Sequence, residues 1–307
     1  MKKLIVTILA AVITLSSLSA QGGLDVLRYN PDVRSAGAGD TFMGDASGMY
    51  IYSNPTSFLY NANMAYGGYS FGMFPKIGDN GRMMAHTVAA GYMFDKHAIQ
   101  IGFRMLSGLE VDNIDDNLLN KGVLTPRDMT FDLGYSYKVN ENIAAYITGT
   151  YIMAELDEKA STFGASLGAY YKNAFAVGSN EYNYNVGMAI NNIGAPIKYS
   201  SGSYSIPANI SLGGSIAIPL AENHTIKPAL TAQYYFANSF GAGIGVEYEA
   251  MDMISARVGL HVGDNNTYYT IGIGAKVKMA TINLSYQIAD KTSPVNGLLR
   301  LGVGVNF

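Results

Sequence analysis

The histidines are the residues that could most directly do chemistry, because imidazole serves as a base, a nucleophile or a metal ligand near neutral pH. His86, His97, His224 and His261 are scattered along the chain, without an HExxH motif or a Ser-His-Asp order around them. There is no cysteine, which excludes disulfides, thiolate metal sites and a lipidated cysteine anchor. The sequence predicts a protein that is not an enzyme and that needs neither a metal nor a cofactor.

Two further motifs, a group of aspartates and the Gly-x-Gly triplets, could suggest a calcium site or a nucleotide site, but neither matches the known sequence pattern of such a site. Asp112, Asp115 and Asp116 could bind Ca²⁺, yet their spacing departs from known calcium loops, and a solvated acidic loop explains them more simply. The Gly-x-Gly triplets at 37–39 and 272–274 have no βαβ context, so they do not indicate a nucleotide site. Glycines that face a crowded interior are the simpler interpretation.

A third group consists of ionisable residues that fall on the polar face of expected β-strands. Both signs of charge occur among them, so they can pair with one another or with charged residues near the N-terminus. Arg or Lys facing lipid at mid-depth would cost roughly 2–4 kcal/mol, which favours placing them in the interior of a barrel. These expected lumen-facing charges are Arg104, Asp132, Glu247, Arg257, His261, Lys276 and Arg300.

The elements that must position these charges are clearest between Phe240 and Phe307. Apolar and polar residues alternate there with a period of two, as in 269–277, where Tyr, Ile, Ile, Ala and Val oppose Thr, Gly, Gly and Lys. Side chains alternate between the two faces of a strand, so each run has one apolar and one polar face. A soluble sandwich would show similar alternation in shorter strands. Runs of about ten residues are instead the length of a tilted strand that crosses a bilayer.

The whole chain after residue 63 can be divided into such runs. We therefore predict an all-β fold, a transmembrane antiparallel up-and-down β-barrel of about 14 strands, with a short, partly helical N-terminal plug. Short turns are expected on the periplasmic side and longer loops outside, with both ends of the chain in the periplasm. The strands are predicted at 64–74, 84–94, 98–108, 128–138, 142–154, 162–172, 181–192, 206–218, 225–237, 240–249, 253–262, 267–278, 281–289 and 298–307.

The composition and the N-terminus agree with an exported membrane protein. Residues 1–20 have two lysines, an apolar core and a small polar end, which is typical of a secretory signal peptide. Charged residues make up 14% of the 307 residues, well below a soluble domain, while the mean hydropathy is only +0.11. The net charge of −3 gives no sign of nucleic-acid binding. We expect the protein in the bacterial outer membrane, in contact with its lipid.

Residues 21–63 differ from the rest, because they are rich in Gly, Asp, Ser and Asn-Pro pairs that favour turns and short helices. Fourteen strands enclose a lumen wider than wall side chains can fill. The segment is too apolar to be a disordered leader, so we expect it to fold inside the barrel of residues 64–307 as a plug. The last residue, Phe307, is expected at the inner membrane interface, where it would assist barrel assembly.

The expected plug also carries a motif that resembles a known family. An aspartate, a basic residue and Ala-Gly-Ala-Gly are followed by Asp-Ala and Asn-Pro, and the strand sequences GVEYEAMDMISARVGLHVGDN and YYTIGIGAKV add to the likeness. Together they resemble the PorV/PorQ family of FadL-like outer-membrane barrels. Asn-Pro-Thr replaces the usual Asn-Pro-Ala. The motif residues are Arg34, Gly37, Gly39, Asp40, Asp45, Asn54 and Pro55.

The resemblance implies two alternative functions. One is a role in type IX protein secretion, with secretion-system or cargo proteins as partners at the outer membrane. The other is a FadL-like channel for the uptake of hydrophobic small molecules, which would need an apolar pocket between plug and wall. The predicted lumen-facing rows consist mostly of Gly, Ser, Asn and charged residues, which favours the first alternative.

Overall fold

The computed structural model describes residues 24–44, 48–77, 81–114, 120–155, 157–178, 180–264, 266–291, 293 and 295–307, with only the backbone given at 111–114 and 120–121. The predicted signal peptide at 1–20 lies outside these residues, as do Asp45, Asp115 and Asp116. Of Asp112 only the backbone is described. No helix within the described ranges is long and apolar enough to cross a membrane.

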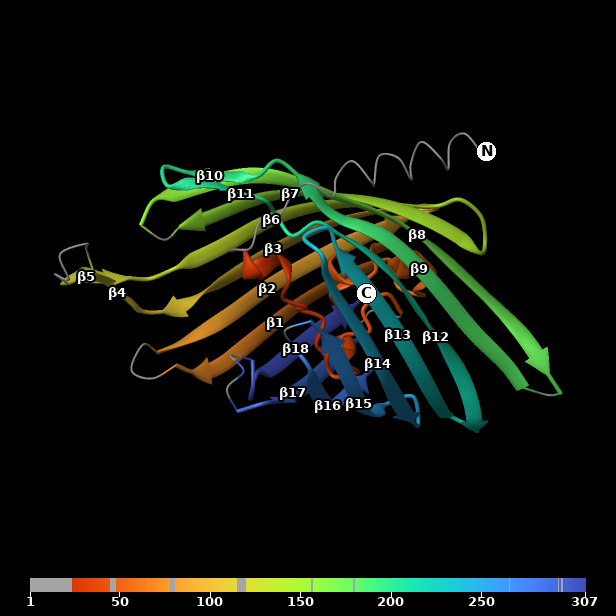
Figure 1. The fold of residues 1–307 in the computed structure, drawn as a ribbon. Coiled ribbons are helices and arrows are strands. Elements are labelled where there is room, and N and C mark those ends of the chain that lie inside the picture. Colours follow the sequence, from red (N-terminus) through yellow and green to blue (C-terminus); the bar gives the residue numbers. More distant parts are fainter. Residues whose placement is uncertain are drawn as a thin grey trace.

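Fourteen antiparallel strands form a closed barrel, in which β1 pairs with β18 to complete the ring (Figure 1). The predicted fold class and strand number are confirmed, and each predicted strand overlaps one wall strand. The wall strands are β1 (Ala65–Lys76), β2 (Gly81–Phe94), β3 (His97–Leu109), β6 (Arg127–Lys138), β7 (Ile143–Glu155), β8 (Lys159–Val177), β9 (Asn180–Gly194), β12 (Asn209–Ala221), β13 (His224–Tyr235), β14 (Ser239–Ala250), β15 (Ile254–Gly263), β16 (Tyr268–Val277), β17 (Ala280–Ala289) and β18 (Leu299–Asn306).

The two rims of the barrel differ in their connections. At one end, which we call the turn rim, strands are joined by short turns such as the one between β14 and β15. At the other end, the hairpin rim, two longer connections form small separate sheets that the sequence did not predict. These are the hairpins β4 (Val111–Ile114) with β5 (Asn120–Leu124), and β10 (Ile197–Tyr199) with β11 (Gly202–Tyr204).

One predicted connection is wrong. The segment 173–180, between the strands predicted at 162–172 and 181–192, was expected to form a turn, but β8 continues to Val177 and β9 begins at Asn180. The two strands stay paired because Phe175 stacks on Tyr182 across them, with ring centroids 5.2 Å apart. Such cross-strand aromatic pairs stabilise a hairpin beyond the point where hydrophobic alternation ends.

The faces expected for the last five strands are confirmed. Ile271 is 48% exposed and points outward, whereas its neighbour Gly272 is buried in the interior. The pattern follows from the pleat, since successive side chains leave opposite faces of a strand. The outward face is apolar and the inward face is small or polar, as a barrel wall in a bilayer requires.

The residues before β1 form a compact segment inside the ring of strands (Figure 1). We call residues 24–44 and 48–63 the N-terminal segment. Its short helices end quickly, because glycine and Asn-Pro sequences interrupt them. They are η2 (Asp25–Leu27), α2 (Val33–Ala36), η3 (Tyr50–Tyr52) and η4 (Pro55–Tyr60).

The N-terminal segment contributes to both main apolar clusters of the interior. Leu24, Val26 and Leu27 pack near the hairpin rim with Leu106 and Ile197, so the β10–β11 hairpin lies over this end. Near the turn rim the segment packs through η3 and η4 in the second cluster. That cluster contains Met49, Tyr50, Ile51, Phe58, Leu59, Tyr66, Ala89, Ala98 and Ala144. The interior is thus filled by the chain's own first residues.

Candidate functional site

The candidate site is the interface between the N-terminal segment and the inner face of the wall. At its centre is Glu247 of β14, which is 4% exposed. Arg34 of α2 donates two hydrogen bonds to this carboxylate, from Nε to Oε2 at 2.8 Å and from Nη2 to Oε1 at 2.6 Å. Arg257 of β15 also donates to Oε2, and Lys227 Nζ lies 3.8 Å from Oε1. Bidentate arginine–carboxylate pairs of this kind fix orientation as well as charge.

Arg257 is held by the wall itself. Its Nη1 donates to Asn283 Oδ1 at 2.9 Å and its Nη2 to Ser255 Oγ at 2.6 Å. Lys227 also contacts Glu249, at 3.1 Å between Nζ and Oε2. The wall therefore presents a positioned carboxylate, and Arg34 is the cation that the N-terminal segment contributes.

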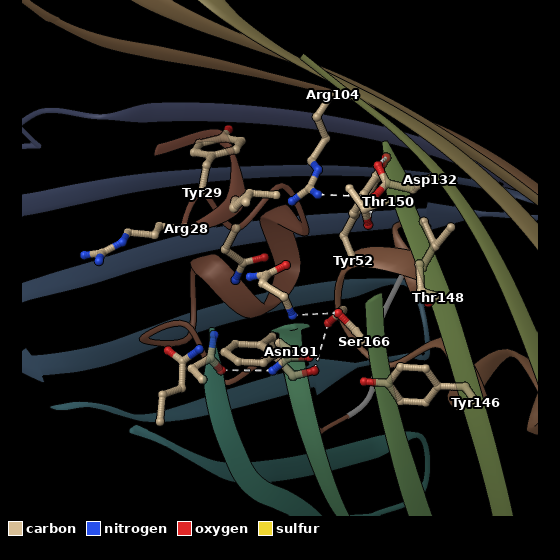
Figure 2. A pocket seen from close by; sticks show the side chains of 18 of the residues that line it. Arg28, Tyr29, Tyr52, Arg104, Asp132, Tyr146, Thr148, Thr150, Ser166 and Asn191 are labelled. Carbon is tan, nitrogen blue, oxygen red and sulfur yellow. Dashed lines mark hydrogen bonds and ion pairs between the residues drawn. The ribbon is translucent and has the colours of Figure 1, made fainter. Parts of the chain in front are cut away.

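A second ion pair joins the segment to the opposite wall. Arg104 Nη2 lies 3.3 Å from Asp132 Oδ1, and its Nη1 donates to the backbone oxygen of Val26 at 3.1 Å. Tyr52 of η3 donates its hydroxyl to Asp132 Oδ2 at 2.8 Å, and the Arg104 guanidinium lies 4.5 Å from the Tyr52 ring centroid. Thr150 donates to the same carboxylate at 2.7 Å, and Figure 2 labels Arg104, Asp132, Thr150 and Tyr52 in this part of the interior. Two separate parts of the segment, at Val26 and Tyr52, are thus hydrogen-bonded to one wall ion pair.

Asp40 makes the third polar connection. It has a positive φ of 62°, accepts a hydrogen bond from Asn30 Nδ2 at 2.9 Å and accepts another from the Tyr268 hydroxyl. The His261 ring is stacked on Tyr268 with centroids 4.7 Å apart, so this histidine supports the tyrosine rather than a metal. Within the described residues, no three His, Cys, Asp or Glu side chains lie close enough together to hold a metal ion.

The Ala-Gly-Ala-Gly stretch lies directly on glycines of the wall. A Cβ added to Gly243 would collide with the carbonyl oxygen of Gly39, and one added to Gly259 would collide with the Gly39 amide. Gly37 faces Gly272 in the same way. The Gly39 amide donates to Thr270 Oγ1 at 2.8 Å. Lumen-facing glycines therefore let two backbones approach each other, which only residues without Cβ allow.

Asn54 and Pro55 organise the start of η4. Asn54 is 1% exposed; its Nδ2 donates to the Met43 carbonyl at 3.2 Å, and its Oδ1 accepts from Thr56 at 2.6 Å. Pro55 occupies the first turn of the helix, where a missing amide hydrogen costs nothing. Its carbonyl accepts from Gln100 Nε2 at 2.9 Å, which ties the helix to β3.

The remaining expected residues lie apart from these contacts. Lys276 is exposed near the turn rim, where it lines a cavity of about 240 Å³ with Lys227, Glu249 and Asp252. Arg300 is buried beside the Tyr29 ring. Phe307 is exposed, but its backbone exchanges hydrogen bonds of 2.8 and 3.1 Å with Ala65 across the closure of the barrel.

Several residues of the interface were missed by the sequence analysis. Asn30, Tyr52 and Tyr268 contact the expected charges directly, and Asp32 is fully buried beneath α2. Burial raises the pKa of Asp32, while Arg34 opposes that rise. The Asn30-Pro31-Asp32 sequence resembles an ordinary turn, so only the fold could reveal its contacts.

A second cavity, of about 100 Å³, lies between the segment and β3, β6, β7, β8, β9, β12 and β13. Arg104, Asp132, Thr148, Ser166 and Asn191 are among the residues that line it, and Figure 2 labels these side chains together with Tyr52. Its lining is therefore mainly polar.

The geometry of segment and wall can be compared with known proteins. A family profile described as "Type IX secretion system protein PorV" matches residues 21–238. No curated protein sequence matches significantly.

Solved structures share the fold at low sequence identity. The toluene transporter TbuX of Ralstonia pickettii superposes with a TM-score of 0.64 at 14% identity, covering 91% of this chain and 98% of that one. The P. putida toluene transporter TodX gives 0.63 at 11% identity with the same coverage. A Pseudomonas aeruginosa FadL homologue gives 0.52 at 10%, again covering 91% and 98%. The chain therefore has a FadL-like fold and belongs to the PorV family of type IX secretion system proteins.

Proposed function

We propose that this protein is a non-enzymatic outer-membrane partner of type IX secretion that receives or presents cargo proteins at the cell surface. Residues 1–20 would direct its export, and the turn rim, which holds both the C-terminus and the start of β1, would face the periplasm. The observation that carries this proposal is the match of the secretion-family profile over residues 21–238.

The interior supports a partner protein better than an uptake channel. TbuX and TodX are described as toluene transporters, and a channel for such molecules needs an apolar path. Here the cavities of about 100 and 240 Å³ are lined mainly by polar and charged side chains. The apolar side chains of the N-terminal segment, such as Phe58 and Met43, are instead packed and buried.

The N-terminal segment would act as a plug that holds the lumen closed during secretion. Its contacts with Glu247, Asp132 and Thr270 involve three separate parts of the wall, so it is fixed on several sides. A closed lumen would leave the outer surface as the place where proteins can bind.

We place the protein-contact surface on the hairpin rim, at β4–β5. In the described part of the chain β4 and β5 form a two-stranded sheet of their own, as β10 and β11 do, but Ile197 anchors the β10–β11 hairpin in the apolar cluster. Val123 of β5 is 57% exposed. A two-stranded hairpin at the outer edge has strand edges that favour pairing with another chain.

The test is co-purification of tagged full-length protein from native membranes solubilised in detergent. We expect secretion-system or cargo proteins to accompany it, and a variant in which residues 111–124 are replaced by a short Gly-Ser turn to lose them. A variant shortened at residues 175–182, on the turn rim, is the matched control and should keep its partners. Recovery of no protein partner, together with saturable binding of a long-chain lipid, would support the uptake channel instead.

A further inference from the structure

The cavity of about 240 Å³ near the turn rim lies between the N-terminal segment and the wall. Arg34, Tyr50 and Asn61 of the segment line one side of it, and residues of β13 to β18 line the other. The exposed Asp252 and Lys276 place one end of the cavity at the turn rim. A water molecule takes about 30 Å³ of liquid volume, so a small organic molecule fits into this space.

The cations on the β13–β15 side of the cavity already have counter-ions. Arg34 and Arg257 share the Glu247 carboxylate. Lys227 Nζ lies 3.1 Å from Glu249 Oε2. This side therefore holds a closed network of ion pairs that needs no further ligand.

The β16–β18 side of the cavity instead carries donors without acceptors. Among the described residues, no carboxylate oxygen lies within 4.0 Å of the Lys276 ammonium. Asn283 Oδ1 accepts from Arg257 Nη1 at 2.9 Å, which fixes the amide and leaves Asn283 Nδ2 without an acceptor in the described structure. Asn306 Oδ1 accepts from Asn61 Nδ2 at 3.4 Å, and the NH₂ group of Asn306 donates to no described residue. The unpaired nitrogens are accessible to solvent rather than enclosed in the protein.

These donors lie around Thr281 on the inward face of the wall. Lys276 of β16 is directly opposite Thr281 of β17, which is opposite Gly304 of β18. Asn283 and Asn306 are each two residues further along the same face. Diagonal neighbours on a sheet face are roughly 7–8 Å apart, within reach of a lysine side chain. The three donor groups can therefore converge on one ligand.

The charges around the cavity favour an anionic ligand. Asp252 is in the turn between β14 and β15, and its carboxylate also has no ion pair among the described residues. Even so, the cations exceed the carboxylates by one. The cations are Arg34, Lys227, Arg257 and Lys276, and the carboxylates are Glu249, Asp252 and the adjoining Glu247.

We propose that this cavity binds the carboxylate group of a small organic acid. Lys276 would form a charged hydrogen bond to the carboxylate, and the amides of Asn283 and Asn306 would donate to its oxygens. The ligand would lie between the wall and the residues Tyr50 and Asn61 of the N-terminal segment. Because it binds the folded arrangement of both parts, it would hold the segment in place.

The first experiment measures binding of succinate to the full-length protein by calorimetry, in a neutral detergent and at constant ionic strength. We expect saturable binding of succinate and none of succinamide, its neutral diamide. Lys276→Met should bind succinate about tenfold more weakly, because a hydrogen bond between charged groups is lost. Lys96→Met is the matched control, since Lys96 is an exposed lysine on the same rim that does not line the cavity, and it should bind as wild type.

Two outcomes of this experiment would overturn the proposal. Equal weakening in Lys276→Met and Lys96→Met would indicate general attraction of anions to the rim. Inorganic phosphate that binds as tightly as succinate would show that the site does not select a carboxylate. Because the experiment uses purified protein alone, its result does not depend on whether secretion partners co-purify.

Asp252→Asn tests the same site in the opposite direction. Asp252 has a φ of 55°, which asparagine also tolerates, so the variant should fold. Removing the unpaired carboxylate should tighten succinate binding, a gain that poor folding cannot imitate. Unchanged or weaker binding in Asp252→Asn would place the succinate site outside this cavity.

The second experiment follows hydrogen exchange of the backbone amides at 50–61, with and without succinate. Slower exchange is expected in the wild type, because the bound acid would hold this part of the segment against the wall. Lys276→Met should show no such protection at the same succinate concentration. Wild-type exchange that succinate does not change would contradict a ligand between the segment and the wall.

Discussion

Arg34 and Glu247 are 213 residues apart in the chain and form a bidentate ion pair, with 2.6 Å between Nη2 and Oε1. Arg257 binds the same carboxylate from the wall, so one buried anion is shared by a cation of the N-terminal segment and a cation of the barrel. The pair is a direct connection between the two parts of the molecule. The position of the N-terminal segment and the stability of the wall therefore both depend on Glu247.

Glu247→Gln should destabilise the folded protein strongly. Removing the anion takes the shared carboxylate away from the buried Arg257 and the half-buried Arg34, and breaking a buried pair in this way typically costs about 3–5 kcal/mol. We expect a lower temperature for the loss of compact migration in gels. Arg34→Met is the comparison, because Glu247 then keeps Arg257 and the loss should be smaller. Equal stability of Glu247→Gln and wild type would show that the network contributes little.

Gly243→Ala should displace the N-terminal segment without breaking the barrel. The added methyl group would meet the Gly39 carbonyl, which belongs to backbone and cannot move alone. Faster proteolysis within residues 24–44, at unchanged strand content, is the expected result. Gly149→Ala, on β7, has no atom within 4 Å of the added Cβ and should behave as wild type. If the two variants are equally resistant, the close packing of the backbones is not important.

Ile271→Arg should impair assembly more than Ile254→Arg. Both residues point outward, but Ile271 lies within β16 and Ile254 is the first residue of β15. Arginine facing lipid costs roughly 2–4 kcal/mol at mid-depth and about 0–1 near the interface. The fraction of heat-resistant, compact protein in membranes measures the difference. Equal assembly of both variants would argue against a bilayer around this face.

Deletion of Phe307 should slow barrel closure, because its backbone forms two hydrogen bonds with Ala65. Phe307→Ala keeps these bonds and removes the aromatic ring, so it separates the two contributions. If the ring at the membrane interface matters, Phe307→Ala should assemble poorly and Phe307→Tyr normally, when folded protein is followed over time. Normal assembly of the deletion would mean that the terminal residue is dispensable.

Deletion of residues 22–60 should open the lumen. Roughly eight strands already suffice for an interior filled by side chains, so fourteen leave room that the segment occupies. Large, steady conductance is expected for the deletion in planar bilayers, and little for the full-length protein. Similar conductance of the two proteins would contradict the role of the segment as a plug.

The sequence alone determined the barrel. Most wall strands have a period-two pattern that depends only on local residues, so fourteen strands could be predicted, and the faces of residues such as Ile271 and Gly272 followed from the pattern. The end of β8 and the two outer hairpins escaped prediction. At the end of β8 the sequence no longer alternates, and the strands are held together by cross-strand contacts such as the stacking of Phe175 on Tyr182.

The tertiary structure alone decided the partners inside the lumen. Sequence analysis placed Arg34, Glu247 and Arg257 in the interior, but ion pairing depends on the closed ring and on the path of the segment through it. The need for glycine in the wall could not be predicted from the sequence either. It becomes clear only in the fold, where the Gly39 backbone lies against Gly243 and Gly259. Alternation is a property of one strand, whereas these contacts join residues that only the fold brings together.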